Sequence, residues 1–309
     1  MHLVIPFAAV RSDAGRAALR DLQLPQLARR LAGRTPQHDR GEPVDGDEEL
    51  SLNTPHDRAL ARAWGWSAGD GLLPFAAHAA RADGVDTGER PWGLLTPVHW
   101  HAGAEQVSLS DPAELPLSDA DSRSFFDTLA PLFTSEGFVM RWGAADRWYL
   151  SHDSLAGLAT ASLDRVVGRN VDRWLPGGRD ARLWRRLQNE CQMVLHTHPL
   201  NAARETARQP TVNSLWLSGC GVGQPVPEAT AAAVRVDLRL RAPALAGEWA
   251  DWRSAWADLD RSLADPGLAQ LTLCGEAASA TFDLSPLGTW AGWRARWQGA
   301  PLAAWLEAL

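Results

Sequence analysis

The chain has 309 residues, of which 45% are hydrophobic and 22% are charged, as in ordinary globular proteins with a sizeable core. Its net charge of −7 at pH 7 disfavours general nucleic-acid binding, which requires a clustered basic surface. No stretch reaches the roughly 18 consecutive apolar residues of a membrane span, so we expect no membrane partner and a cytoplasmic protein. The three cysteines form no CxxC pair, which disfavours a cysteine-ligated zinc site.

The N-terminal residues carry a strand pattern followed by helical patterns. Residues 3–10 are apolar and predict a buried strand, and residues 13–31 place leucine and alanine at helical spacing. Residues 34–54 are acidic and rich in turn formers, so we expect an exposed loop. Thr54 and Pro55 then predict the start of a helix, with threonine as the N-cap and proline at the first helical position.

The middle of the chain mixes strand and helix patterns without strict alternation. The predicted strands are 94–101, 106–109, 138–142, 147–151 and 213–217, and the predicted helices are 73–81, 118–133, 162–174 and 180–198. The sequence GAAD between the third and fourth of these strands predicts a β-hairpin. A glycine-rich stretch follows the last strand and predicts a turn.

Near the C-terminus the sequence predicts three strands, at 234–240, 268–274 and 280–284. Residues 249–256 and 290–297 repeat one pattern, with tryptophan at i, i+3 and i+7 on one helical face. We expect two amphipathic helices that pack on a common sheet. The alternative is a pair of aromatic faces that bind a partner.

These patterns predict an α/β (or α+β) protein with a layered mixed sheet flanked by helices. We expect a single compact domain over residues 1–309, with a possible sub-boundary in the Pro- and Gly-rich loop at 223–229.

The stretch from residue 168 to residue 223 places many polar side chains among apolar residues. A buried polar group costs about 1–3 kcal/mol unless it is hydrogen-bonded. This stretch is therefore either a structural hydrogen-bond network or a ligand site. The polar residues concerned are Asn170, Asp172, Arg173, Gln188, Asn189, Glu190, His196, His198, Asn201 and Asn213.

The glycines at 219–223 invite comparison with phosphate-binding loops, because glycine lets backbone N–H groups approach an anion. The pattern is GxGxG rather than GxGxxG, since Gln224 occupies the last position, and the chain has no lysine for a Walker motif. A sharp structural turn is the interpretation we favour. A thiolate mechanism would pair Cys220 with His196 or His198.

Two histidine pairs are candidates for a divalent metal. His99, His101 and Glu105 match the first part of a cupin metal motif, which puts two imidazoles and a carboxylate around a metal. His196 and His198 would need a further ligand such as Glu190 or Glu205. The favoured alternative for the second pair is that these histidines cap the end of a helix.

Several segments of the chain resemble the RpfE-type regulatory proteins of bacteria, whose members are often labelled cofactor-independent phosphoglycerate mutases. The matching segments are MHLVIPFA at 1–8, LLTPVHW at 94–100, SLDRVVGRNVDRWLP at 162–176, RRLQNECQMVLHTHPLNAARE at 185–205 and VNSLWLSGCG at 212–221. Within the last segment, the pattern N-x-x-W-x-x-G-x-G is similar to a turn of the archaeal-type mutases of the alkaline phosphatase superfamily. The resemblance implies a distant alkaline-phosphatase-like core and two-metal phosphoryl transfer by clustered Asp and His.

From the residues themselves we predict a pocket that binds a small polar or anionic metabolite, with a regulatory role, no predicted cofactor and unproven catalysis. Arg169 or Arg173 would pair with an anion. The alternatives are a metal-dependent phosphotransferase of the phosphomutase type and a regulatory module that binds a protein partner or forms a homo-oligomer. The predicted ligand-binding residues are Arg169, Asn170, Asp172, Arg173, Asn189, Glu190, Asn213, Ser218, Gly219 and Gly221.

Overall fold

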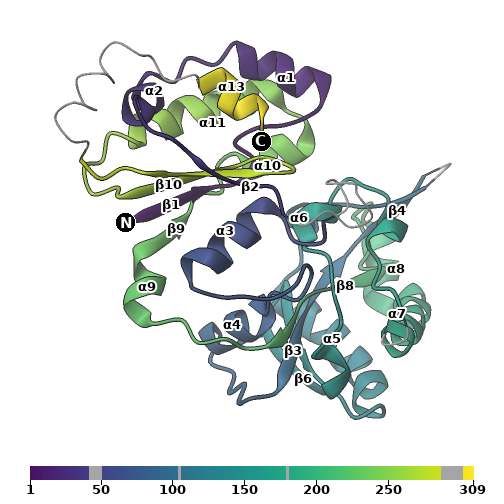
Figure 1. The fold of residues 1–309 in the computed structure, drawn as a ribbon. Helices are drawn as coiled ribbons and strands as arrows, with labels where there is room; N and C mark the ends of the chain where they lie inside the picture. Colours follow the sequence, from purple (N-terminus) through teal and green to yellow (C-terminus); the bar gives the residue numbers. More distant parts are fainter. Residues whose placement is uncertain (42–50, 104–105, 179–180, 287–301) are drawn as a thin grey trace. The chain divides into compact units, whose positions relative to one another are not determined.

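The computed structural model describes residues 1–41, 51–103, 106–178, 181–286 and 302–309. They form two compact units: unit 1 comprises residues 1–67 and 226–309, and unit 2 comprises residues 68–225 (Figure 1). One crossing between the units therefore lies inside the loop 223–229 that the sequence predicts as a boundary. The expectation of a single domain over residues 1–309 stays a prediction.

Unit 1 is built on a five-stranded mixed sheet in the order β2-β11-β10-β1-β9. The inner strand β1 (His2–Ile5) runs parallel to its neighbours β9 (Val234–Val236) and β10 (Gln270–Cys274). Strand β11 (Ser279–Asp283) pairs antiparallel with β10, and β2 (Gln37–Asp39) pairs antiparallel with β11. The prediction of a mixed sheet flanked by helices is confirmed.

Helices of unit 1 lie on both faces of this sheet (Figure 1). Ile5, Leu271 and Leu273 face one side and pack with residues of α1, α2 and α11. Val4 and Cys274, which alternate with them along the strands, contact Ala59 of α3 on the other side. The helices of this unit are α1 (Asp13–Arg20), α2 (Pro25–Leu31), α3 (Pro55–Ala63), α9 (Glu228–Ala233), α10 (Arg241–Ala246), α11 (Trp249–Ser262) and α13 (Leu302–Glu307).

Local signals placed the start of α3 correctly and the helix at 13–31 only in part. Thr54 and Asp57 form a capping box, in which each side chain accepts a hydrogen bond from the other residue's backbone N–H. The predicted helix 13–31 is two helices, because Pro25 begins a new one at its first position. Strand β1 is also shorter than predicted, since the backbone turns at Phe7, where φ is 56°.

The tryptophan face at 249–256 lies in the core of unit 1. Trp252 and Trp256 are fully buried, and their rings meet edge to face with centroids 6.2 Å apart. This copy of the repeat therefore packs on the sheet, as we favoured, and the partner-binding alternative is wrong for it. The second copy, 290–297, lies outside the described residues.

Unit 2 contains a four-stranded antiparallel sheet in the order β6-β7-β3-β8. The strands are β3 (Pro91–Val98), β6 (Val139–Ala144), β7 (Arg147–Ser151) and β8 (Ser214–Val222). The predicted hairpin is confirmed as β6 and β7. A separate two-stranded hairpin pairs β4 (Trp100–Ala102) with β5 (Val107–Leu109).

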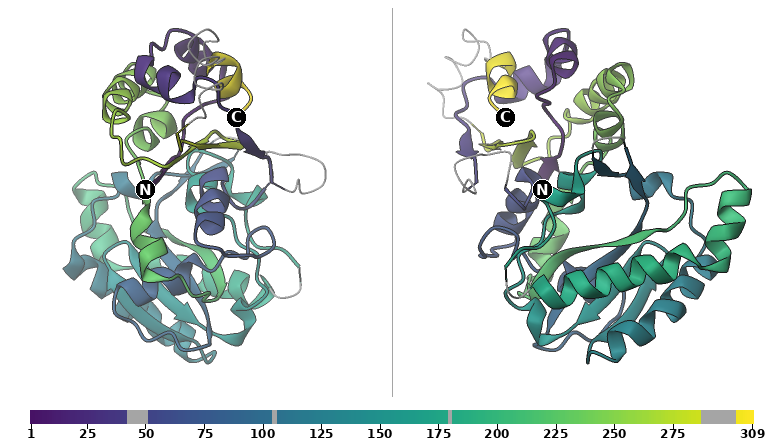
Figure 2. Two further views of the ribbon diagram at one scale, coloured as in Figure 1. Left: turned by 60° about the vertical axis from the view of Figure 1, so that its left-hand side comes forward. Right: turned by 90° about the vertical axis from the view of Figure 1, so that its right-hand side faces the viewer.

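Helices cover both faces of this second sheet (Figure 2). Trp148 and Leu150 of β7 pack with the two long helices, α5 and α7, while Tyr149 between them packs against α4. The helices of unit 2 are α4 (Phe75–Ala82), α5 (Asp119–Thr134), α6 (Leu163–Val166), α7 (Ala181–His196) and α8 (Pro199–Thr206). Among the described residues, no helix is both long enough and apolar enough to cross a bilayer.

One predicted helix, 162–174, is mostly not helical. Helix α6 is a single turn, after which Gly168 adopts a φ of 73° that ends the helix. A short 3-10 helix, η4 (Val171–Arg173), follows. Asn170, Asp172 and Arg173, expected on one helix, therefore lie in a loop and a 3-10 turn.

Candidate functional site

Gly219 and Gly221, which the sequence places in a sharp turn beside the predicted ligand site, lie within strand β8 instead. Gly219 has a φ of 62°, and a Cβ atom there would lie 2.9 Å from the backbone nitrogen of Ala76. A Cβ atom at Gly221 would lie 3.3 Å from Cβ of Pro74. The missing side chains thus let the beginning of α4 pack directly on β8. The predicted turn is wrong, because the strand continues to Val222.

Asn213 connects the start of β8 to β4 through its amide group. Its Oδ1 accepts a hydrogen bond from the backbone N–H of Trp100 at 2.7 Å, and its Nδ2 donates to the carbonyl oxygen of Trp100 at 2.8 Å. The amide therefore supplies the two hydrogen bonds that the backbone of a neighbouring strand would supply, at a point where β4 no longer pairs with the four-stranded sheet. Both ends of the Asn213 side chain are occupied by this role.

Asn201 makes a similar connection between α7, α8 and the chain entering β8. Its Nδ2 donates to the carbonyl oxygens of Leu195 at 2.8 Å and Val212 at 2.7 Å, and its Oδ1 accepts from the N–H of Val212 at 3.0 Å. Gln188 is also buried and donates to the carbonyl oxygen of Leu215 at 3.0 Å. These polar residues form a structural network, which is one of the two interpretations of the sequence.

The predicted ligand-binding residues on η4 lie at the surface. Asp172 and Arg173 are exposed, and Asn170 uses its side chain to accept a hydrogen bond from the backbone N–H of Asp172 at 3.1 Å. Arg169 is half-buried in the preceding loop and Ser218 is buried in β8. None of these five side chains lines the pocket described below, so their binding role stays a prediction.

The two predicted ligand-binding residues on α7 do not line the pocket described below: Asn189 faces solvent, and Glu190 pairs with an arginine. Glu190 lies 3.9 Å from Arg186 one helical turn earlier, and both side chains are about half exposed, at 42% and 52%. Such surface pairs contribute little to stability. These side chains do not join Asn213 around one hollow.

The first histidine pair does not form a metal site in the described part of the chain. Nδ1 of His99 bonds to the carbonyl oxygen of Thr211 at 2.9 Å, whereas His101 is exposed on β4. Glu105, the third member of the predicted motif, lies outside the described residues. No group of three or more His, Cys, Asp or Glu side chains there is placed to hold a metal ion.

The second histidine pair separates, with His196 at the end of α7 and His198 at the start of α8. His198 is the N-cap of α8: its Nδ1 accepts from the N–H of Leu200 at 3.3 Å. Its Nε2 therefore carries the proton and donates to Oγ1 of Thr128 at 3.1 Å, while its ring contacts Phe125. Burial lowers the pKa of His198, which keeps this tautomer neutral. His198 therefore caps a helix, as we favoured, but it caps the start of α8 rather than the end of α7.

Cys220 is fully buried, and burial raises the pKa of its thiol to about 12. At neutral pH the sulfur is protonated, so it lacks the thiolate that nucleophilic catalysis requires. The arrangement gives no support to the thiolate mechanism.

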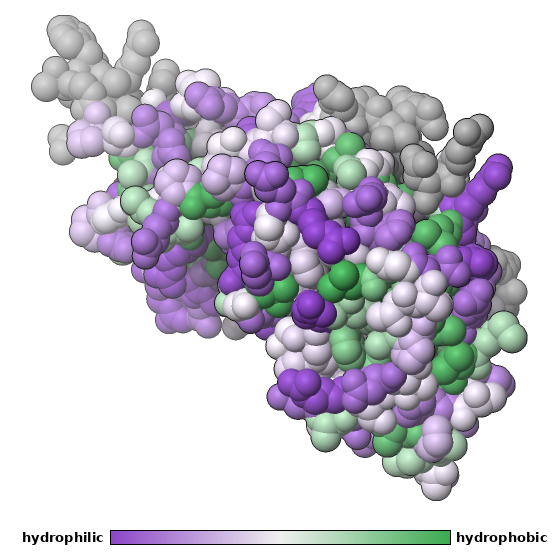
Figure 3. All heavy atoms as spheres, turned by 90° about the horizontal axis from the view of Figure 1, so that it is seen from below, coloured by the Kyte–Doolittle hydropathy of each residue, from purple (hydrophilic) through white to green (hydrophobic). Residues whose placement is uncertain are grey.

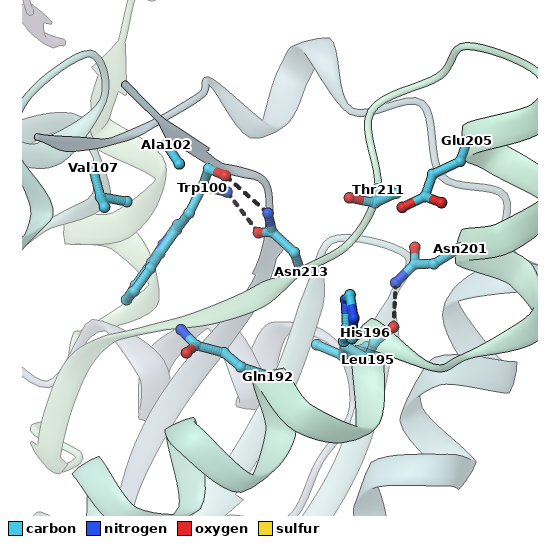
Figure 4. A pocket seen from close by; sticks show the side chains of 10 residues that line it. All are labelled: Trp100, Ala102, Val107, Gln192, Leu195, His196, Asn201, Glu205, Thr211 and Asn213. Carbon is cyan, nitrogen blue, oxygen red and sulfur yellow. Dashed lines mark hydrogen bonds between the residues drawn. The ribbon is translucent and has the colours of Figure 1, made fainter. Parts of the chain in front are cut away.

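A pocket of about 350 Å³ lies in unit 2 between the β4–β5 hairpin, the end of α7, α8 and the start of β8 (Figure 4). We call it the β4–α7 pocket. It is lined by Trp100, Ala102, Val107, Gln192, Leu195, His196, Asn201, Glu205, Thr211 and Asn213. Three of these residues, His196, Asn201 and Asn213, belong to the polar set that the sequence singled out.

The polar groups of this pocket fall into two classes. Asn201 and Asn213 are saturated by backbone partners, as described above. The carboxylate of Glu205 has no ion pair or hydrogen-bond partner among the described residues, and it points inward toward Thr211 (Figure 4). Gln192 has one end of its amide bonded to Oγ of Ser214 at 3.0 Å, which leaves the other end available.

Trp100 forms one side of the pocket, and its ring extends toward Gln192 (Figure 4). Its indole nitrogen is shielded from solvent and has no hydrogen-bond partner within the described part of the chain. Sequence reasoning missed both Trp100 and Gln192 as pocket residues.

Comparison with known proteins does not assign the chain to a family. No family model matches it, and no curated protein matches it. The cofactor-independent phosphoglycerate mutase from Thermoplasma acidophilum is similar with a TM-score of 0.37 and 15% identity, over 91% of this chain and 88% of that chain. The PH0037 protein from Pyrococcus horikoshii is similar with a TM-score of 0.42 and 11% identity, over 91% and 86%.

Similarities at this level say nothing about activity. Membership of the RpfE-type family and an alkaline-phosphatase-like core therefore stay predictions. The described residues also do not fit the two metal ions that the resemblance implies. The first strand, β1, has the sequence His-Leu-Val-Ile and supplies no carboxylate ligand, and the described residues contain no cluster of metal ligands.

Proposed function

We propose that the β4–α7 pocket binds a small polar organic molecule and that the protein acts through this binding. The observation that carries the proposal is the combination of a 350 Å³ hollow with lining groups whose bonding capacity is unused among the described residues, above all the Glu205 carboxylate. Small-molecule sites are typically hollows of about 300–1,000 Å³ with apolar walls and a few polar groups that orient the ligand.

The apolar part of the wall comes from Trp100, Val107 and Leu195, which lie on three different elements. The mixture of one aromatic side chain and several polar side chains suits a small organic molecule better than an inorganic ion.

The two alternative functions receive less support. The phosphotransferase needs clustered metal ligands, and the described residues offer none. The interaction module needs exposed tryptophan faces, and Trp252 and Trp256 are buried. On the face in Figure 3, hydrophobic residues lie in small groups separated by hydrophilic ones. The large hydrophobic side chains exposed among the described residues are Met193, Val222, Val236 and Leu238.

The test uses the indole N–H resonances of the full chain labelled with ¹⁵N-tryptophan. A Trp100→Phe variant assigns the Trp100 resonance. We expect at least one member of a set of small amines, alcohols, amides and carboxylates to shift this resonance at millimolar concentration, while the resonance of buried Trp252 in unit 1 stays in place.

An Ala102→Phe variant adds a ring to the pocket lining, and we expect it to abolish the shift. Ala203→Phe, at an exposed position of α8 that does not line the pocket, is the matched control and leaves the shift intact. If no compound in the set shifts the Trp100 resonance of the unmodified protein, the proposed function is wrong.

A further inference from the structure

The described lining of the β4–α7 pocket carries a net negative charge. Among the described residues, Glu205 is the only Asp, Glu or Arg side chain that lines the pocket. The arginines that the sequence offered as anion partners, Arg169 and Arg173, are not part of the lining. An anionic ligand would lack a cationic partner here and would be repelled by Glu205.

The remaining polar groups of the lining that backbone partners do not already occupy can all accept a hydrogen bond, including the free amide oxygen of Gln192. Thr211 supplies a hydroxyl oxygen toward which the Glu205 carboxylate points, and His196 supplies a ring that accepts at one nitrogen when it is neutral (Figure 4). An ammonium group donates three hydrogen bonds and accepts none, which matches this set. A hydroxyl or carboxylate ligand would leave more of these acceptors without a donor.

The indole of Trp100 adds to the same preference. Tryptophan is the aromatic side chain that attracts cations most strongly, and its large apolar face also packs against hydrocarbon. Val107 and Leu195 extend the apolar wall. A volume of 350 Å³, near the lower end of the usual range, limits the occupant to a small molecule.

We propose that the ligand of the β4–α7 pocket is a small organic amine without a carboxylate, whose ammonium group pairs with Glu205 and whose apolar body lies against Trp100. This inference rests on the proposed function, because it names the chemical class of the molecule that the same pocket binds. The pair would form at the mouth of the pocket, since Glu205 is an exposed residue.

Three probes of one shape test the charge preference: phenethylamine, 2-phenylethanol and phenylacetate, titrated into the full chain at pH 8 with the Trp100 indole resonance as the readout. We expect phenethylamine to bind about tenfold more tightly than 2-phenylethanol, which corresponds to about 1.4 kcal/mol. Phenylacetate is expected to bind most weakly. The common phenyl group keeps the apolar contribution constant across the three.

Glu205→Gln keeps the size of the side chain and removes its charge. We expect this variant to lose the preference for phenethylamine and to bind the amine and the alcohol about equally. Glu114→Gln is the matched control, because Glu114 is an exposed glutamate of unit 2 that does not line the pocket. It is expected to keep the full preference.

The outcomes separate this inference from the proposed function. If 2-phenylethanol or phenylacetate shifts the Trp100 resonance at concentrations equal to or below those of phenethylamine, the amine class is wrong while the pocket still binds a small molecule. If Glu205→Gln keeps the preference, the pairing with Glu205 is wrong. If none of the three probes acts, the amine inference fails, and the proposed function is decided separately by the wider set of compounds.

Discussion

Two overlapping regions of unit 2 use polar side chains in opposite ways. At the junction of α7, α8 and β8, the amide groups of Asn201 and Asn213 bond to backbone groups at 2.7–3.0 Å. In the β4–α7 pocket, which both asparagines also line, the carboxylate of Glu205 has no partner among the described residues, and one end of the Gln192 amide is unused. Polar residues in an apolar stretch therefore do not by themselves mark a ligand site, because backbone partners can use all of their bonding capacity.

We expect the largest loss of stability when the Asn201 side chain is removed. In Asn201→Ala, the buried carbonyl oxygen and N–H of Val212 lose their partner, while the carbonyl oxygen of Leu195 keeps only the N–H of His198, so we expect the free energy of unfolding to fall by about 3 kcal/mol. Urea denaturation followed by circular dichroism measures this loss. A change below about 1 kcal/mol would show that water replaces the amide, and the structural role would be wrong.

Removing Asn213 tests the same idea at a half-buried position. Asn213→Ala breaks both hydrogen bonds to the backbone of Trp100, and we expect a loss of about 1–3 kcal/mol, smaller than for Asn201 because solvent reaches part of the site. Denaturation curves give the loss. The Trp100 indole resonance should also shift; an unchanged resonance would contradict a link between this amide and the pocket.

His198 makes the free energy of unfolding depend on pH. Burial lowers its pKa from the ordinary value of 6.5, so below pH 6.5 the unfolded chain binds more protons than the folded protein. The stabilisation from this residue is complete above pH 6.5 and is lost as pH falls through the lowered pKa. We expect the stability advantage of the unmodified protein over His198→Gln to shrink between pH 8 and pH 5. Other histidines cancel in this difference, and a constant advantage would contradict the prediction.

Glu205 is expected to give the smallest change in stability. Because its carboxylate has no partner among the described residues, Glu205→Gln should alter the free energy of unfolding by no more than about 0.5 kcal/mol. Thermal unfolding without added ligand measures this. A loss above about 1 kcal/mol would mean that the carboxylate stabilises the fold, which would sharply reduce its value as a ligand partner.

Features that depend on local physics could be predicted from the sequence. The capping box at Thr54 and the β6–β7 hairpin follow from side chains close together in the chain. The burial of Trp252 and Trp256 follows from their helical spacing. The mixed α/β class follows from the same strand and helix patterns.

Features that depend on distant contacts could not be predicted in this way. Gly219 reads as a turn residue, but it is needed because the first turn of α4, about 140 residues earlier in the chain, packs onto β8. The sequence predicts that Asn213 binds a ligand and leaves the role of Asn201 open, because their backbone partners lie on other elements. Glu205 emerged as a pocket residue only once α8 and the β4–β5 hairpin were placed around the same hollow.

The two hydrogen bonds between the Asn213 amide and the backbone of Trp100 also bear on the free energy of ligand binding. They immobilise the main chain of Trp100, the residue whose side chain forms a wall of the pocket. Ordering a backbone segment costs about 1–2 kcal/mol per residue, and here that cost is met during folding rather than when a guest arrives. The aromatic side of the pocket is thus preorganised, so a ligand of the proposed kind would bind without the entropic cost of ordering this backbone segment.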